Sequence, residues 1–162
     1  MMKPHRLLPT LLISFLLLSA HAEADFDTGV AAYAAGDYET AFSEFKSGAE
    51  ASDVMSQQNL AVMYRNGEGV RQDYKEAVKW LTNAAQQGEA TAQYTLGSMY
   101  YDGEAVLQNI VFAHMWWEIA SSNGIEDARK NRDVIAKIMT PGQLADAQRL
   151  ARECVKKEYK NC

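Results

Sequence analysis

Few side chains in this sequence have the types and spacing that catalysis or metal binding requires. After residue 22 the only histidine is His114, so no histidine has a second histidine or a cysteine at the spacing of metal ligands. The serine and cysteine residues have no general base within a recognisable motif. Gly67-Glu68-Gly69 has no strand before it and no Gly-Lys-Ser after it, so it is not a phosphate-binding loop. The sequence therefore predicts no catalytic residue, no metal ligand and no cofactor.

The remaining candidates for chemistry are better explained by structural roles. Glu126 and Asp127 stand at the start of a helical stretch, where the helix dipole stabilises negative charge. His114 has apolar neighbours on a helix, and we interpret it as a packing residue at a partly buried helix edge. The chain is therefore predicted not to be an enzyme.

The elements that position these side chains form a repeat. The following residues recur with the same residue type 36 positions later: Leu60, Met63, Tyr64, Gly67, Glu68, Val70, Gln72, Ala77, Trp80, Ala84, Gly88 and Ala92. A period in this range indicates stacked pairs of antiparallel helices, each of which buries its apolar face against its neighbours. The predicted fold is all-α: a right-handed solenoid of about four helix pairs, closed by a C-terminal capping helix.

Capping residues mark where the helices should begin. Asp37, Asp73 and Asn109 precede apolar helical stretches, Thr140 precedes a proline that begins the last helix, and a helix is expected from Gln57. The expected segments are a signal peptide at 1–22, a degenerate first helix pair at 23–57, repeats at 58–93 and 94–129, and C-terminal helices with a tail at 130–162.

The first 22 residues have the features of a secretory signal peptide. Lys3 and Arg6 precede an apolar stretch, which ends in Ala20-His21-Ala22 and is shorter than the roughly 20 residues of a membrane span. We expect cleavage before residue 23, or alternatively before residue 25, and export to the bacterial periplasm or beyond. After cleavage 14 basic residues face 21 acidic ones. This balance argues against nucleic acid as a partner and favours a basic one.

Cys154 and Cys162 are the only cysteines, and an oxidising compartment would permit a disulfide between them. In a continuous helix their separation of eight residues would place them about 12 Å apart, which is too far for a bond. A disulfide therefore requires the last helix to end near Tyr159 and the tail to fold back. The sequence leaves both arrangements open.

The repeated pattern resembles that of Sel1-like repeat proteins, which are related to tetratricopeptide repeat proteins. The resemblance covers roughly residues 26–155 and departs from the family pattern at Ala105 and Asn109. It implies an adaptor or scaffold that binds other proteins. The residues that carry it are Leu60-Ala61-x-x-Tyr64-x-x-Gly67-x-Gly69-Val70-x-Gln72-Asp73-Tyr74, with Ala77, Trp80, Ala84, Ala85 and Gly88.

One face of the first helix of each pair is predicted to line a concave groove. In such stacks this face binds extended or helical peptides, and tyrosines on it are good anchors. The candidate partner-binding residues are Gln58, Val62, Arg65, Tyr94, Ser98, Tyr101 and Asp102.

Three other functions stay open at this point. Trp80 and Trp116 share one repeat position and are expected in the core, whereas exposure of Trp117 beside Tyr101 would favour a carbohydrate or peptidoglycan binder. A cell-wall enzyme would need a catalytic pair inside a pocket. A self-associating structural unit would have an apolar outer face.

Overall fold

We describe the protein from a computed structural model that covers residues 26–104 and 108–162. The predicted signal peptide and Ala105 lie outside these residues. The described chain consists of helices and turns without strands, so the all-α prediction is confirmed. A helix at 26–34 is followed by α2 (Tyr38–Glu50), α3 (Val54–Asn66), α4 (Tyr74–Gln86), α5 (Ala90–Asp102), α6 (Ile110–Ser122), α7 (Glu126–Ala136) and α8 (Pro141–Lys156).

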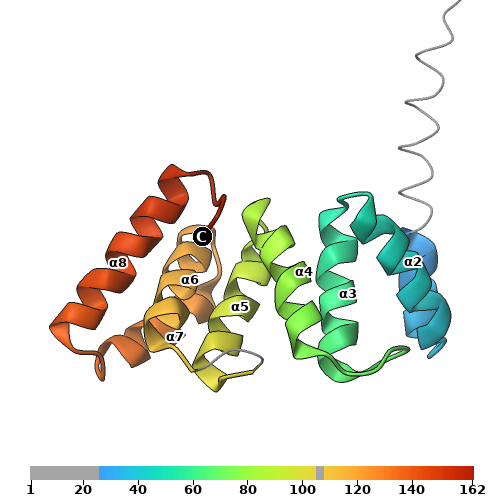
Figure 1. Cartoon of the computed structure of the whole chain (residues 1–162), viewed down its shortest axis with the longest axis horizontal. Coiled ribbons are helices and arrows are strands. Elements are labelled where there is room, and N and C mark those ends of the chain that lie inside the picture. The colour runs from blue at the N-terminus through green and yellow to red at the C-terminus, as the bar shows by residue number, and fades with distance from the viewer. Residues whose placement is uncertain (1–25, 105–107) are drawn as a thin grey trace, which may run out of the picture.

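Successive helices pack side by side along the molecule (Figure 1). Each helix from α2 to α6 packs against the next one in the chain, and α8 returns to pack against α6. Small residues lie where the helices approach closely, since Ala61, Ala77, Ala84 and Ala113 are all fully or almost fully buried. This arrangement is the predicted stack of helix pairs, with α8 as its C-terminal cap.

Polar side chains define the helix starts by accepting bonds from free backbone N–H groups. Asn109 stands where the first repeat has Asp73, and it accepts from the second and third residues of α6 at 3.1 and 3.2 Å, so the replacement keeps the cap. Asp53 accepts from Ser56 N at 2.7 Å. Because of this cap α3 begins at Val54, three residues before the expected start.

A buried glutamine links each helix pair to the next. Gln93 donates from Nε2 to the Ala85 carbonyl at 3.2 Å and accepts from Asn123 Nδ2 at 2.8 Å. Gln57, one repeat earlier, makes the matching pair of bonds at 3.3 and 2.9 Å. Since a buried amide without partners is costly, these bonds favour one register between neighbouring pairs.

The C-terminal tail folds back after α8 and is closed by a disulfide between Cys154 and Cys162, whose Cα atoms are 5.3 Å apart. The helix ends at Lys156, and the reversal follows through residues in the left-handed region, among them Tyr159 with a φ of 64°. The hydroxyl of Tyr159 lies 3.3 Å from the side chain of Asn123. The tail thus reaches the residue that bonds Gln93.

Replacing both cysteines by serine should lower the free energy of unfolding by about 2–3 kcal/mol, because the unfolded chain regains the freedom of a short closed loop. Urea denaturation of the oxidised protein and of the Cys154→Ser/Cys162→Ser variant measures this difference. Reduced protein with both cysteines is the control and should match the variant. Equal stability of all three forms would contradict the anchored tail.

Candidate functional site

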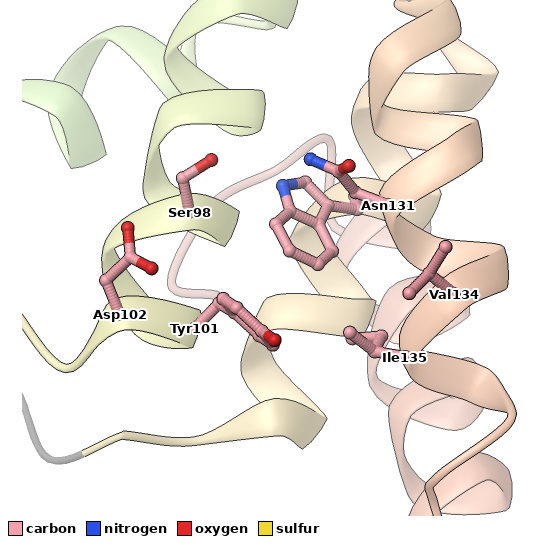
Figure 2. Close-up of a pocket in the computed structure, with 7 residues that line it drawn as sticks. Ser98, Tyr101, Asp102, Asn131, Val134 and Ile135 are labelled. Atoms are coloured by element: carbon pink, nitrogen blue, oxygen red, sulfur yellow. The ribbon is translucent and has the colours of Figure 1, made fainter.

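A hollow of about 220 Å³ opens between α5 and α7, with α6 behind it (Figure 2). Figure 2 shows Asn131, Val134 and Ile135 on α7, opposite the α5 residues. The side chains that line the hollow are Ser98, Tyr101, Asp102, Trp117, Asn131, Val134 and Ile135. Three of the seven candidate partner-binding residues therefore meet at one site.

The indole of Trp117 contributes to this hollow from α6. It is buried, with 3 % of its surface exposed, and its Nε1 donates to the Tyr94 carbonyl at 3.2 Å. The ring of Tyr101 lies 5.6 Å from the indole, centroid to centroid, and tilted by 40°. The indole is therefore held by a hydrogen bond and by an aromatic neighbour.

Gly97 makes the space that the indole occupies. A Cβ at this position would lie 2.5 Å from Cδ1 and 2.6 Å from Nε1 of Trp117, which is closer than atoms can pack. In the preceding repeat the same two positions hold Ala61 and Leu81. The second repeat thus has a smaller residue on its first helix, Gly97, and a larger one on its second helix, Trp117.

The rim of the hollow is polar. Ser98 Oγ donates to the Tyr94 carbonyl at 3.3 Å, and Asn131 Nδ2 donates to the Tyr94 hydroxyl at 3.3 Å. Tyr94 is half-buried by these contacts, so it supports α5 against α7 rather than standing open as an anchor. Asp102, by contrast, has no hydrogen bond or ion pair with any residue in the described ranges.

The α7 side of the hollow is apolar and open. Val134, which lines the hollow, has 60 % of its surface exposed, and Ile138, in the turn after α7, has 69 %. Tyr101 reaches from α5 toward α7 with 37 % of its surface exposed (Figure 2). Large apolar side chains this exposed and close together are typical of a surface that a partner covers.

The candidate residues of the first repeat lie apart from the hollow. Arg65 bonds both carboxylate oxygens of Glu104, at 2.8 and 3.1 Å, and these hydrogen bonds raise the pKa of Arg65. Gln58 and Val62 are half-buried on the same helix. Since Arg65 occupies the repeat position of Tyr101, an ion pair stands in the first repeat where the second has an open aromatic ring.

Sequence reasoning missed the α7 residues of the site, although the repeat contained the signal. Val134 lies 36 positions after Ser98, which lies 36 after Val62, so the three share one position of the pattern. The predicted second repeat ends at residue 129, so most of α7 falls outside the predicted repeats. The 36-residue spacing continues into α7, although the residue types of the repeat are not kept there.

The tryptophans differ in burial from one another. Trp116 is buried, as expected, and Trp117 is buried too, so it does not offer the exposed indole that would favour stacking on a sugar. Trp80 was expected in the core, but it is half-buried, and Lys79 Nζ lies 5.4 Å from the centre of its ring. The reason is that α4 lacks the covering helix that α8 provides for α6.

The titratable candidates for chemistry have structural environments. His114 is 2 % exposed, deeper than the partly buried edge that we expected, because α5, α7 and α8 all pack around α6. This burial disfavours the imidazolium and lowers the pKa of His114. Glu126 pairs with Arg129, and Asp127 with Lys130, within α7.

The described residues contain neither a metal-binding cluster nor a membrane-spanning helix. No group of three histidine, cysteine, aspartate or glutamate side chains in residues 26–104 and 108–162 is placed to hold a metal ion. In the same ranges no helix has both the length and the apolar character to cross a membrane.

The fold and the hollow together define an α-solenoid repeat protein with an open site on its repeated face. The Sel1 repeat family model matches residues 54–89 and 90–125, in the 36-residue period found in the sequence. The resemblance to Sel1-like repeat proteins is therefore confirmed: residues 54–125 are two tandem Sel1 repeats. No match was found among curated proteins.

Two solved structures share the fold. A protective antigen of uropathogenic Escherichia coli with an SLR fold is 28% identical, with a TM-score of 0.79 over 85% of this chain and 31% of that one. A Sel1 repeat protein from Oxalobacter formigenes is 26% identical, with a TM-score of 0.66 over 79% of this chain and 55% of that one. This chain thus spans about a third of the length of the first protein and about half of the length of the second.

Gly97→Ala should lower the free energy of unfolding by about 1–3 kcal/mol, because the added methyl group displaces the indole of Trp117. In a Trp117→Leu background, which restores the Ala61/Leu81 pairing of the first repeat, the same change should cost less than about 0.5 kcal/mol. Urea denaturation of the four proteins completes the cycle. If Gly97→Ala lowered the free energy of unfolding equally in both backgrounds, the close packing of Gly97 against the indole of Trp117 would be contradicted.

Proposed function

We propose that this chain is a non-catalytic, exported adaptor that binds a protein or peptide through the surface formed by α3, α5 and α7. The observation that carries the proposal is the hollow between α5 and α7, whose lining includes the exposed ring of Tyr101, the exposed side chain of Val134 and the carboxylate of Asp102, which has no ion pair among the described residues. Rigid aromatic anchors beside a pocket are typical of sites that contribute most of the binding energy in protein complexes.

The size of the hollow favours a side chain of a peptide over a free small molecule. Its volume of about 220 Å³ is below the roughly 300–1,000 Å³ of pockets that enclose drug-sized ligands. A peptide can place one side chain there and make its other contacts along the neighbouring helices. A repeat surface also offers such contacts in a row, one helix pair after another.

Export is supported by two independent features. The first is the signal-peptide pattern of residues 1–22. The second is the disulfide between Cys154 and Cys162, since such bonds persist in oxidising compartments such as the bacterial periplasm. We therefore place the adaptor in the periplasm or outside the cell.

A carbohydrate or peptidoglycan binder is the alternative, and an enzyme-like cell-wall protein is a further one. The first would use an open aromatic face, and Tyr101 is the exposed ring at the hollow. The second would need a base beside a nucleophile, and the buried His114 does not line the hollow. Both have less support than a peptide site.

The double variant Tyr101→Ala/Val134→Glu should lose its partner, because it removes the anchor and puts a charge on the apolar wall. Recovery of cross-linked partners from envelope extract, measured by mass spectrometry, should fall at least about 10-fold, which corresponds to about 1.4 kcal/mol. Val155→Glu is the matched control, since Val155 is also an exposed valine but lies on α8.

Circular dichroism must first show equal helicity in the three proteins. Partners retained by the double variant would place the binding site elsewhere on the molecule. Absence of any protein partner, together with retention of the wild type on purified cell wall, would overturn the adaptor in favour of glycan binding.

A further inference from the structure

The hollow between α5 and α7 contains a charge that its own fold does not use. Among the seven side chains that line it, the carboxylate of Asp102 is the one charged group. It forms no ion pair with the described residues, whereas nearby Glu104 is held by Arg65. A carboxylate without a partner on the rim of an otherwise neutral hollow can pair with a cation from outside.

The position of Asp102 is unfavourable for the helix that carries it. Asp102 is the last residue of α5, where the free carbonyl groups give the helix end a partial negative charge. Neutral Asn66 and Ile138 occupy the same repeat position 36 residues before and after it. The nearby charge of Arg65 offsets part of this cost, but no ion pair among the described residues holds the carboxylate, so a role in binding would explain its place.

Other acids close to the site are already neutralised. Arg132 bonds Glu118 on α6 at 2.9 Å and its own neighbour Asp133 at 2.6 Å. Asp102 therefore remains as the acid that lines the hollow without an ion pair among the described residues, although the charge of Arg65 also acts on it. The C-terminus of α5 adds a partial negative charge, so both the carboxylate and the helix end attract a cation.

The wall across from Asp102 is apolar. Figure 2 shows Tyr101 reaching from α5 toward Val134 and Ile135 on α7, with Asp102 on the α5 side. An aliphatic side chain entering between Tyr101 and Val134 would cover apolar surface that is now exposed to water. The carboxylate and the apolar wall line one small hollow, so two neighbouring side chains of one peptide reach both.

We infer that the hollow selects a peptide segment in which an aliphatic residue is adjacent to a lysine or arginine. This inference rests on the proposed peptide-binding function and adds the chemistry of the partner. The aliphatic side chain packs between Tyr101 and Val134, and the cationic side chain pairs with Asp102. The net charge of −5 favours the approach of such a basic segment.

The test is selection of random heptapeptides displayed on phage against protein purified after expression of the full sequence. Wild type is compared with Asp102→Asn and with Glu39→Gln, which removes one negative charge from an exposed position on α2 that has no ion pair with residues 26–104 or 108–162. On wild type and Glu39→Gln, leucine, isoleucine or valine next to lysine or arginine should be enriched. On Asp102→Asn the aliphatic preference should remain and the basic preference should disappear.

A peptide selected on wild type should bind Asp102→Asn about 5-fold more weakly at low salt, and the difference should shrink as salt screens the pair. Enriched peptides without a basic preference, or with the same preference on Asp102→Asn, would overturn the inference and leave peptide binding intact. If wild type enriches no peptide above an uncoated surface, peptide binding itself fails, and the inference fails with it.

Discussion

The contact between Gly97 and Trp117 determines the shape of the candidate site. Because Gly97 has no side chain, the indole lies directly against α5, where a Cβ would be 2.5 Å from the ring. From there its Nε1 bonds the Tyr94 carbonyl, and its ring supports Tyr101. The first repeat, with Ala61 and Leu81 at these positions, has no indole to support an aromatic ring. One exchange of small and large residues thus gives the second repeat a surface that the first lacks.

Residues that recur in both repeats stabilise the fold, whereas several residues that differ between the repeats form the candidate binding site. Hydrogen bonds that recur at the 36-residue spacing, such as those of Gln57 and Gln93, join each helix pair to the next. In a solenoid each repeat contacts only its neighbours, so such bonds are needed at every junction. Four of the residues that differ between copies line the hollow, namely Ser98, Tyr101, Asp102 and Trp117, where the first repeat has Val62, Arg65, Asn66 and Leu81. Arg65 is used in an ion pair, whereas its counterpart Tyr101 is left open to a partner.

Much of the fold could be predicted from the sequence, because helix pairs repeat their caps and buried alanines at fixed spacing. The site could be predicted only in part. Tyr101, Ser98 and Asp102 were found from the face that they share on one helix. Val134 was missed because α7 preserves the spacing and not the residue types. His114 was placed too near the surface, since one helix's pattern does not show that three others surround it. Such burial depends on tertiary packing.

Photo-cross-linking in living cells shows whether the hollow between α5 and α7 contacts a protein partner. A photoreactive phenylalanine analogue would replace Tyr101 in one strain and Val155 in another, and adducts would be identified after irradiation. If a protein binds at the hollow, position 101 should give a discrete protein adduct and position 155, on α8, should give none. An adduct from position 155 alone, or glycan fragments in place of protein at position 101, would contradict protein binding at the hollow.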